Sequence, residues 1–292
     1  MKTGLILEGG AMRGMFTCGV TDVFMENGIN FDGVIGVSAG AAFGCNIKSK
    51  QPGRAVRYNK RFAHDWRYSS LRSLFTTGDL YGAKFCYETI PYELDVFDFQ
   101  TFKNNPTEFH IVATNAETGE PIYKKLELCD IHDMTWIRGS ASLPIVAKPV
   151  KIDGYTLLDG GVTDSIPVKY FESIGFDCNV VILTQPRGFV KTLPSVMPLM
   201  KLVLKKYPNF LRAMAHRHIM YNEETQYVFD KADKGELIVI CPETSLNMRR
   251  TEKNPDEMER VYQIGRRMGE KWLDRVREFI THPLLPNTYS VQ

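Results

Sequence analysis

The sequence lacks any long hydrophobic run, although 43% of its 292 residues are hydrophobic. The longest candidate segment, residues 196–204, is interrupted by Pro198 and Lys201, whereas a membrane-spanning helix needs about 20 apolar residues. The first apolar run holds about four apolar residues before Glu8, fewer than the roughly 7–15 of a signal-peptide core. We therefore expect a soluble, cytoplasmic protein.

The chain also lacks an excess of one charge and the cysteine spacing of a metal site. Its 36 basic and 34 acidic residues give a net charge of +2, which argues against a nucleic-acid partner. No C-x-x-C pair occurs, and no cysteine pairs with a histidine at zinc spacing. We therefore expect no metal and no other cofactor. We also expect reduced, mostly buried thiols at Cys18, Cys45, Cys86, Cys129, Cys178 and Cys241.

The order of the predicted elements indicates the fold class. Residues 3–8 form a short apolar run, 12–27 have helical spacing, 31–37 are again strand-like, and 38–47 are compatible with a helix. Such alternation is typical of an α/β protein with a mostly parallel sheet. We expect further helices at 54–65, 131–142, 168–173 and 257–280, and further strands at 108–116, 122–126, 146–152, 155–158, 179–184 and 236–241.

Two regions depart from this alternation. Residues 68–98 are aromatic and irregular, and they could cover a site. Beyond about Pro186, prolines punctuate long helical patterns, and no internal repeat is visible. We therefore divide the chain into a first domain, residues 1–186, and a mainly helical extension of unknown role, residues 187–292.

A serine lies in the pattern Gly36-Val37-Ser38-Ala39-Gly40, between a predicted strand and a predicted helix. Small residues at Gly36 and Gly40 allow the tight turn that exposes a serine nucleophile. The N-terminus of the following helix favours negative charge near Ser38. The same pattern also fits a glycine-rich turn in which Ser38 only caps the helix.

A second glycine-rich turn, EGGAMRG at residues 8–14, follows the first strand. Consecutive small residues leave backbone N–H groups free to bind an anion, as a phosphate cradle or an oxyanion hole. An ordinary tight turn fits the pattern as well. A dinucleotide-binding turn would place glycine where Ala11 stands, and the phosphate-loop ending G-K-[ST] is absent.

A third motif, Asp159-Gly160-Gly161, places an acid directly after the strand expected at 155–158. The glycines allow a sharp turn, although an aspartate that merely caps a turn would fit too. Of the six histidines, only His216, His218 and His282 follow Asp159, and none of them has a glycine-rich strand-end context. Asp159 is therefore the better candidate for the base, and a conventional triad with one of these histidines is the alternative.

With these motifs in place, the sequence resembles the patatin-like phospholipase family over about residues 3–186. The matching segments are EGGAMRG, GVSAG, SASLP at 140–144 and LLDGGVTDSIPV at 157–168. The resemblance implies a three-layer sandwich around a mostly parallel sheet. It also implies a lipid acyl hydrolase with a Ser–Asp dyad, no histidine, and a lipid or other acyl ester as substrate.

The resemblance also assigns roles to single residues. It implies Ser38 as the nucleophile and Asp159 as its partner, with Gly10 and Ala11 supplying oxyanion N–H groups. It further implies that Gly9, Arg13 and Gly14 support this hole, that Gly36 and Gly40 form the elbow, and that Gly160 and Gly161 form the turn after the acid. The chain departs from the family at two positions, where Glu8 replaces the commoner aspartate and Ala11 replaces a glycine.

Residues 187–217 contain basic residues interleaved with apolar ones and no acidic residue. Such a segment is suited to peripheral contact with an anionic membrane, here the inner membrane surface, or it is a solvated basic helix face over a core stripe. The alternatives to a dyad hydrolase are a conventional Ser-His-Asp esterase and a catalytically idle, regulatory lipid-binding module. The sequence gives no indication of oligomeric state.

Overall fold

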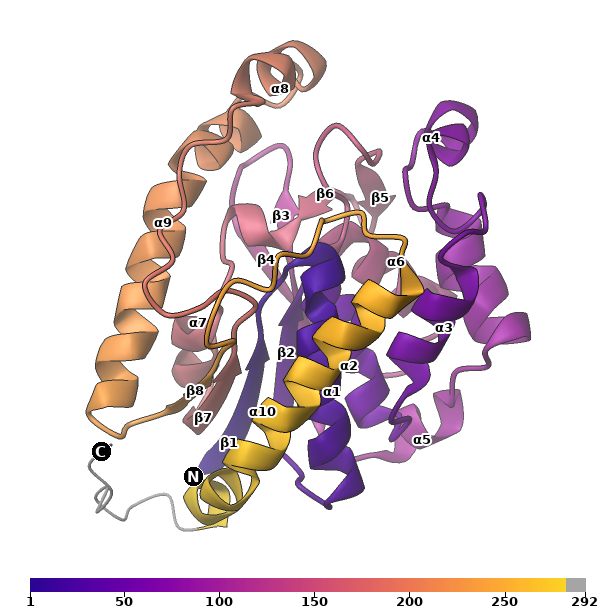
Figure 1. The fold of residues 1–292 in the computed structure, drawn as a ribbon. Helices are drawn as coiled ribbons and strands as arrows, with labels where there is room; N and C mark the ends of the chain where they lie inside the picture. The colour runs from indigo at the N-terminus through magenta and orange to yellow at the C-terminus, as the bar shows by residue number, and fades with distance from the viewer. Residues whose placement is uncertain (282–292) are drawn as a thin grey trace.

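An eight-stranded sheet forms the centre of the computed structural model, which describes residues 1–281 (Figure 1). The strand order is β5-β6-β3-β2-β1-β7-β8, and β4 pairs with β3. Neighbours among β3, β2, β1, β7 and β8 are parallel, whereas β4, β5 and β6 pair antiparallel. The strands are β1 (Lys2–Leu7), β2 (Gly33–Val37), β3 (Glu108–Asn115), β4 (Pro121–Leu126), β5 (Val150–Ile152), β6 (Tyr155–Asp159), β7 (Phe176–Ile182) and β8 (Ile238–Ile240).

Helices cover both faces of this sheet (Figure 1). The α-helices are α1 (Gly14–Glu26), α2 (Ala39–Lys48), α3 (Arg54–Phe62), α4 (Leu71–Thr77), α5 (Phe99–Asn104), α6 (Ile131–Ser140), α7 (Val168–Ser173), α8 (Met197–Val203), α9 (Pro208–Asp233) and α10 (Pro255–Thr281). Three other helical segments are η1 (Ala11–Arg13), the π-helix η2 (Phe85–Leu94) and η3 (Gly160–Val162).

The alternation of side chains along β1 builds the three layers. Leu5 and Leu7 point into a core shared with α1, α2 and α10, whereas Ile6 points into a core shared with α7 and α9. Successive side chains of a strand face opposite sides, so a fully apolar strand must be covered twice. The structure therefore confirms the expected sandwich around a mostly parallel sheet.

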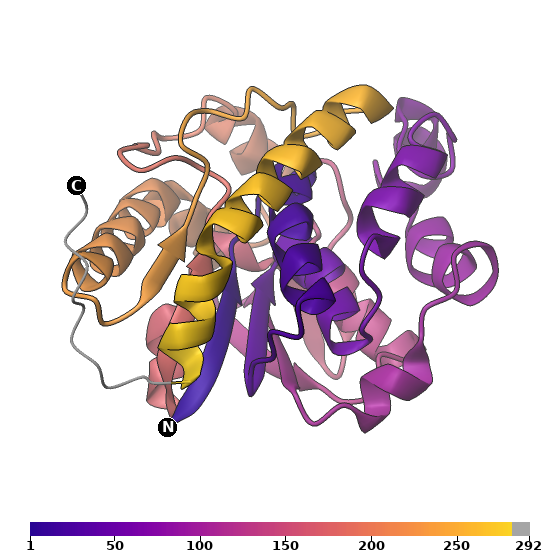
Figure 2. The ribbon, with the colours of Figure 1, turned by 60° about the horizontal axis from the view of Figure 1, so that its bottom comes forward.

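The residues after 186 complete this sheet and both of its helical layers, with α10 on one face and α9 on the other. Strand β8 pairs in parallel with β7, at the edge of the sheet. Helix α10 lies along α1 in both views (Figures 1 and 2). The two helices approach closely at Gly19 of α1 and Gly265 of α10. A Cβ added to Gly19 would lie 2.2 Å from the backbone oxygen of Tyr262, and a Cβ added to Gly265 would lie 2.1 Å from the backbone oxygen of Phe16. The helical extension is thus built into the same layers as the first 186 residues.

Most expected elements are present, and two differ. The strand expected at 146–152 begins only at Val150, because residues 144–147 form a turn and a bend after α6. The irregular region 68–98 is largely helical, with α4 and η2. All six cysteines are free thiols, four of them buried. Within residues 1–281, no helix combines the length and the apolar character that crossing a bilayer requires.

Candidate active site

Ser38 lies at the sharp turn between β2 and α2, with φ 55° and ψ −116°. Such a conformation is strained for a residue with a side chain, and close backbone packing enforces it. A Cβ on Gly36 would lie 2.3 Å from the Gly40 oxygen, and a Cβ on Gly40 would lie 2.3 Å from the Leu7 oxygen. The turn therefore needs glycine at both positions.

The Ser38 hydroxyl donates a hydrogen bond to Asp159, with 2.6 Å between Oγ and Oδ2. Asp159 ends β6, which pairs with β3, the neighbour of β2. Both side chains are buried, with Ser38 7% and Asp159 2% exposed. The turn after the acid holds the carboxylate, because the Gly161 N–H donates to its other oxygen at 2.9 Å, and Gly160 packs against Val112 without room for a Cβ.

The surroundings of Asp159 set its proton affinity. Burial raises its pKa above the ordinary value, against the positive charge of Arg217 and the hydrogen bonds from Ser38 and Gly161. A carboxylate with a raised pKa is a stronger base than one in water. The arrangement therefore allows Asp159 to take a proton from Ser38.

The segment 140–144 links the two candidate residues. The Ser140 hydroxyl accepts the Ser38 N–H at 3.0 Å, and the Ser142 carbonyl accepts the Asp159 N–H at 2.9 Å. The sequence marks this segment as part of a motif but gives it no role. The structure shows that it fixes the backbone of both residues.

The glycine-rich turn lies against the elbow. A Cβ on Gly9 would be 3.0 Å from the Ser38 Cβ, and Gly10 has Thr184 directly beside it. Gly10 and Ala11 line the cavity that contains Ser38, and within residues 1–281 their N–H groups donate no hydrogen bond. Ala11 adopts a positive φ of 49°, so the alanine takes the conformation for which glycine is better suited.

Glu8 anchors this turn and is 2% exposed. One carboxylate oxygen accepts from the Thr184 N–H at 2.5 Å and the Thr184 hydroxyl at 3.1 Å. The other oxygen accepts from the Tyr221 hydroxyl of α9 at 2.8 Å. Further along the turn, Arg13 has a buried Nε without an acceptor among the described residues, and Gly14 begins α1.

Two cavities open at Ser38. An apolar one of about 120 Å³ runs between α2, α3, η2 and α6, and its lining includes Phe43, Tyr58, Tyr87, Ile90 and Ile137. A polar one of about 450 Å³ lies toward α8 and α9. Both are also lined by Ala11 and Leu143. Part of the aromatic region 68–98 thus forms a wall of the apolar cavity.

The histidines of the alternative triad lie apart from the pair. His216 is exposed and its Nδ1 lies 2.9 Å from the Arg212 carbonyl. His218 lines the polar cavity, but within residues 1–281 no hydrogen bond joins it to Ser38 or Asp159. His282 lies outside the described residues.

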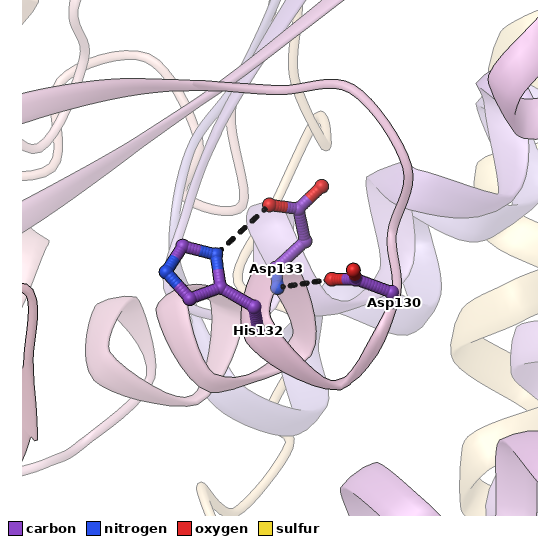
Figure 3. A group of neighbouring side chains, drawn as sticks. All are labelled: Asp130, His132 and Asp133. Carbon is purple, nitrogen blue, oxygen red and sulfur yellow. Dashed lines mark hydrogen bonds and ion pairs between the residues drawn. The ribbon is translucent and has the colours of Figure 1, made fainter.

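One group of possible metal ligands occurs at the start of α6: Asp130, His132 and Asp133 (Figure 3). Asp130 caps the helix by accepting the Asp133 N–H at 3.0 Å. Asp133 accepts three backbone N–H groups, from residues 127, 128 and 129, and His132 contacts Asp153 at 2.9 Å. These hydrogen bonds account for the cluster as a local turn structure.

The structure places in the site basic residues that the sequence analysis had not assigned to it. Lys191 and Arg217, which the sequence suggested for a membrane surface, line the polar cavity together with Arg250. The Arg217 Nε donates to the Gly161 carbonyl at 2.5 Å. No local pattern marks these residues, because they reach the site only through the path of the chain after β7.

Two family models match this chain. A family model described as patatin-like phospholipase matches residues 5–172, more than half of the chain. The chain belongs to the patatin-like phospholipase family. Family membership supports lipid acyl hydrolysis as the general activity. A second family model, a domain of unknown function (DUF6363), matches residues 207–281.

The relatives and the solved structure that this chain resembles share between 14% and 28% identity with it. The uncharacterized protein YjjU of Escherichia coli is 27% identical over 299 residues, 96% of this chain and 79% of that protein. Lysophospholipase NTE1 of Mycosarcoma maydis is 28% identical over 206 residues, 66% of this chain and 10% of that protein. The patatin-like phospholipase chain also resembles VipD from Legionella pneumophila, with a TM-score of 0.48, 14% identity, and coverage of 94% and 67% of the two chains.

Proposed function

We propose that this protein is a serine lipid acyl hydrolase that uses a dyad of Ser38 and Asp159. The observation that carries the proposal is the direct hydrogen bond of 2.6 Å between the Ser38 hydroxyl and the Asp159 carboxylate. A general base must lie within hydrogen-bond reach of the proton that it removes. Since this contact needs no intervening imidazole, it favours the dyad over a conventional triad.

The first half of the reaction follows from these positions. Asp159 takes the Ser38 proton while the hydroxyl oxygen attacks the ester carbonyl carbon. The N–H groups of Gly10 and Ala11 stabilise the oxyanion, and the N-terminus of α2 adds a favourable dipole. The tetrahedral intermediate then expels the alcohol, which receives the proton from Asp159, and the acyl group remains on Ser38.

The second half repeats these steps with water. Asp159 removes a proton from the water molecule that attacks the acyl-enzyme. The same N–H groups stabilise the second oxyanion, and its collapse returns the proton to Ser38 and releases the fatty acid. The apolar cavity beside Ser38 holds the acyl chain, which is consistent with relatives named lysophospholipase.

Labelling with a serine-directed fluorophosphonate tests the nucleophile. We expect one adduct, on Ser38, and its loss in Ser38→Ala but not in Ser245→Ala, a control at an exposed serine. Hydrolysis of p-nitrophenyl butyrate should disappear in Ser38→Ala and fall by about 10⁴-fold in Asp159→Asn, the upper end of what a general base contributes, because the amide cannot take the Ser38 proton.

The same assay decides between the alternatives. Replacing His216, His218 and His282 together by glutamine should leave the ester hydrolysis largely intact. If this triple variant is inactive while Asp159→Asn retains activity, the protein is a conventional esterase. If the wild type neither reacts with the fluorophosphonate nor hydrolyses any ester, it is an idle lipid-binding module.

We also propose peripheral contact with an anionic membrane through residues 187–217. Helix α8 exposes Leu199, Leu202 and Val203 beside exposed Lys201 and Lys205. Helix α4, which exposes Leu71 and Phe75, projects at the same end of the molecule (Figure 1). Apolar side chains beside lysines are suited to the boundary of head groups and acyl chains.

Co-sedimentation with vesicles tests this contact. Binding should be stronger to vesicles that contain phosphatidylglycerol than to pure phosphatidylcholine vesicles. It should weaken in Leu202→Asp and remain in Ile174→Asp, a control at an exposed residue of the helix-to-strand turn before β7. Equal binding to both kinds of vesicle would contradict the proposal.

A further inference from the structure

The polar cavity beside Ser38 has an unusual charge. Its lining includes four cationic side chains, from Arg13, Lys191, Arg217 and Arg250. Among residues 1–281, Asp159 is the one acidic residue that lines it, and this carboxylate is already engaged by Ser38 and Gly161. The cavity therefore concentrates positive charge directly beside the candidate nucleophile.

None of these four cations forms an ion pair with another side chain in residues 1–281, although many other basic residues do. The Lys191 ammonium lies over the Tyr221 ring, 3.4 Å from its centroid, and Arg217 donates to a backbone carbonyl. Glu8 lies nearby, but Thr184 and Tyr221 occupy both of its oxygens. The four cations are thus opposed by the two carboxylates of Glu8 and Asp159, which leaves an excess of positive charge.

Holding these cations together is unfavourable without a ligand. Burial lowers the pKa of Lys191 to about 7, and the positive charges of Arg217, Arg13 and Arg250 add to this shift, whereas the negative charge of Glu8 opposes it. Like charges in a partly buried site repel one another strongly because water screens them less. An anion in the cavity would relieve this repulsion and would satisfy donors such as the buried Arg13 Nε.

We infer that this cavity binds the substrate's head group and selects acyl esters whose head group bears a phosphate and no ammonium group. The inference rests on the proposed acyl hydrolase function. An acyl chain in the apolar cavity and a carbonyl at Ser38 leave the head group in the polar cavity, since both cavities open at Ser38. A choline or ethanolamine would add a cation where no free carboxylate can receive it.

Matched lipids test this selectivity. The wild type is assayed with lysophosphatidylglycerol and lysophosphatidylcholine that carry the same short acyl chain, both below their critical micelle concentrations. Monomeric lipids exclude a general attraction of the protein to charged surfaces. We expect kcat/KM to be at least about tenfold higher for the glycerol lipid, with the difference mainly in KM, because both lipids offer the same phosphate but the choline adds a positive charge that the cations of the cavity repel.

Charge-removing variants locate the source of the preference. Lys191→Met and Arg250→Gln should each reduce the ratio of the two kcat/KM values several-fold. Lys205→Met, at an exposed lysine outside the cavity, should leave the ratio unchanged. The ratio within one variant cancels any general damage to catalysis. Glycerol 3-phosphate should compete with lysophosphatidylglycerol less well in Lys191→Met than in the wild type.

The outcomes separate this inference from the proposed function. Equal kcat/KM for the two lipids overturns the inference, as does a preference that persists in both cavity variants. Inhibition by glycerol 3-phosphate without any preference between the lipids would show a site for a free phosphate compound, and it would also overturn the inference. Absence of Ser38-dependent hydrolysis of p-nitrophenyl butyrate, which has no head group, would instead refute the proposed function.

Discussion

The contact between Glu8 and Tyr221 yields a sharp prediction, because it ties the glycine-rich turn to the C-terminal helix α9. Tyr221→Phe removes the hydroxyl that donates to Glu8 at 2.8 Å and keeps the buried ring. Glu8 then retains its two hydrogen bonds from Thr184. The substitution therefore removes one hydrogen bond without creating a large cavity.

The expected cost follows from the charge and burial of the acceptor. A hydrogen bond to a charged group contributes about 1.5–3 kcal/mol to stability, and a buried acceptor that loses its donor regains no water. We expect Tyr221→Phe to lower the free energy of unfolding by this amount. Tyr227→Phe is the matched control on the same helix, because its hydroxyl donates to the partly exposed Glu172, and its cost should stay below about 1 kcal/mol.

Urea denaturation at pH 7 followed by circular dichroism measures both changes. The kcat for p-nitrophenyl butyrate should also fall in Tyr221→Phe, by less than the roughly 10²–10³-fold that follows loss of a whole oxyanion donor, since Glu8 positions the turn without touching substrate. If Tyr221→Phe and Tyr227→Phe have the same stability within about 0.5 kcal/mol, this contact does not anchor the turn as described.

Three further predictions concern single side chains. Gly40→Ala should leave little folded protein in an expression and thermal-melt assay, because its Cβ would lie 2.3 Å from the Leu7 backbone oxygen. The control is Gly28→Ala, because a Cβ at Gly28 meets nothing within 4 Å. This control should remain folded, at a cost of about 1 kcal/mol for its positive φ. Asp159→Asn should be at least as stable as the wild type at pH 8, although it is inactive. Burial raises the pKa of Asp159, so the ionised carboxylate destabilises the fold above that pKa. A clear loss of stability in urea denaturation would contradict this prediction. Burial likewise raises the pKa of Asp22 from 3.8 to about 6. The protonated form of Asp22 therefore contributes stability that is fully present below about pH 4 and is lost as the pH rises through 6. The total change in the free energy of unfolding is about 3 kcal/mol. The stability of Asp22→Asn relative to the wild type should therefore increase by about 1–2 kcal/mol between pH 5 and pH 8 in urea titrations, and a pH-independent difference would refute the assignment.

Local sequence was sufficient for the fold class and for the candidate pair. The alternation of apolar strands with helices predicts a parallel sheet because each pattern has its own period. Glycines around Ser38 and after Asp159 mark turns that only small residues allow, so these positions stand out without any knowledge of the fold. The carboxyl ends of parallel strands meet at one edge of an α/β sheet, and this rule led us to expect Ser38 and Asp159 together. Strand β6 is in fact antiparallel to β3, and its register, with Asp159 opposite Ala113, is what brings together these two residues 121 positions apart in the chain.

The C-terminal region and the electrostatics of the site depend on tertiary packing. The pairing of β8 with β7 and the packing of α10 along α1 depend on contacts between residues that are far apart in the sequence. The sequence shows Lys191 and Arg217 as two basic residues in a basic segment, and a membrane-facing position suits them equally well. Their placement beside Ser38 depends on long-range packing, and local periodicity contains no information about which distant surface a side chain will meet.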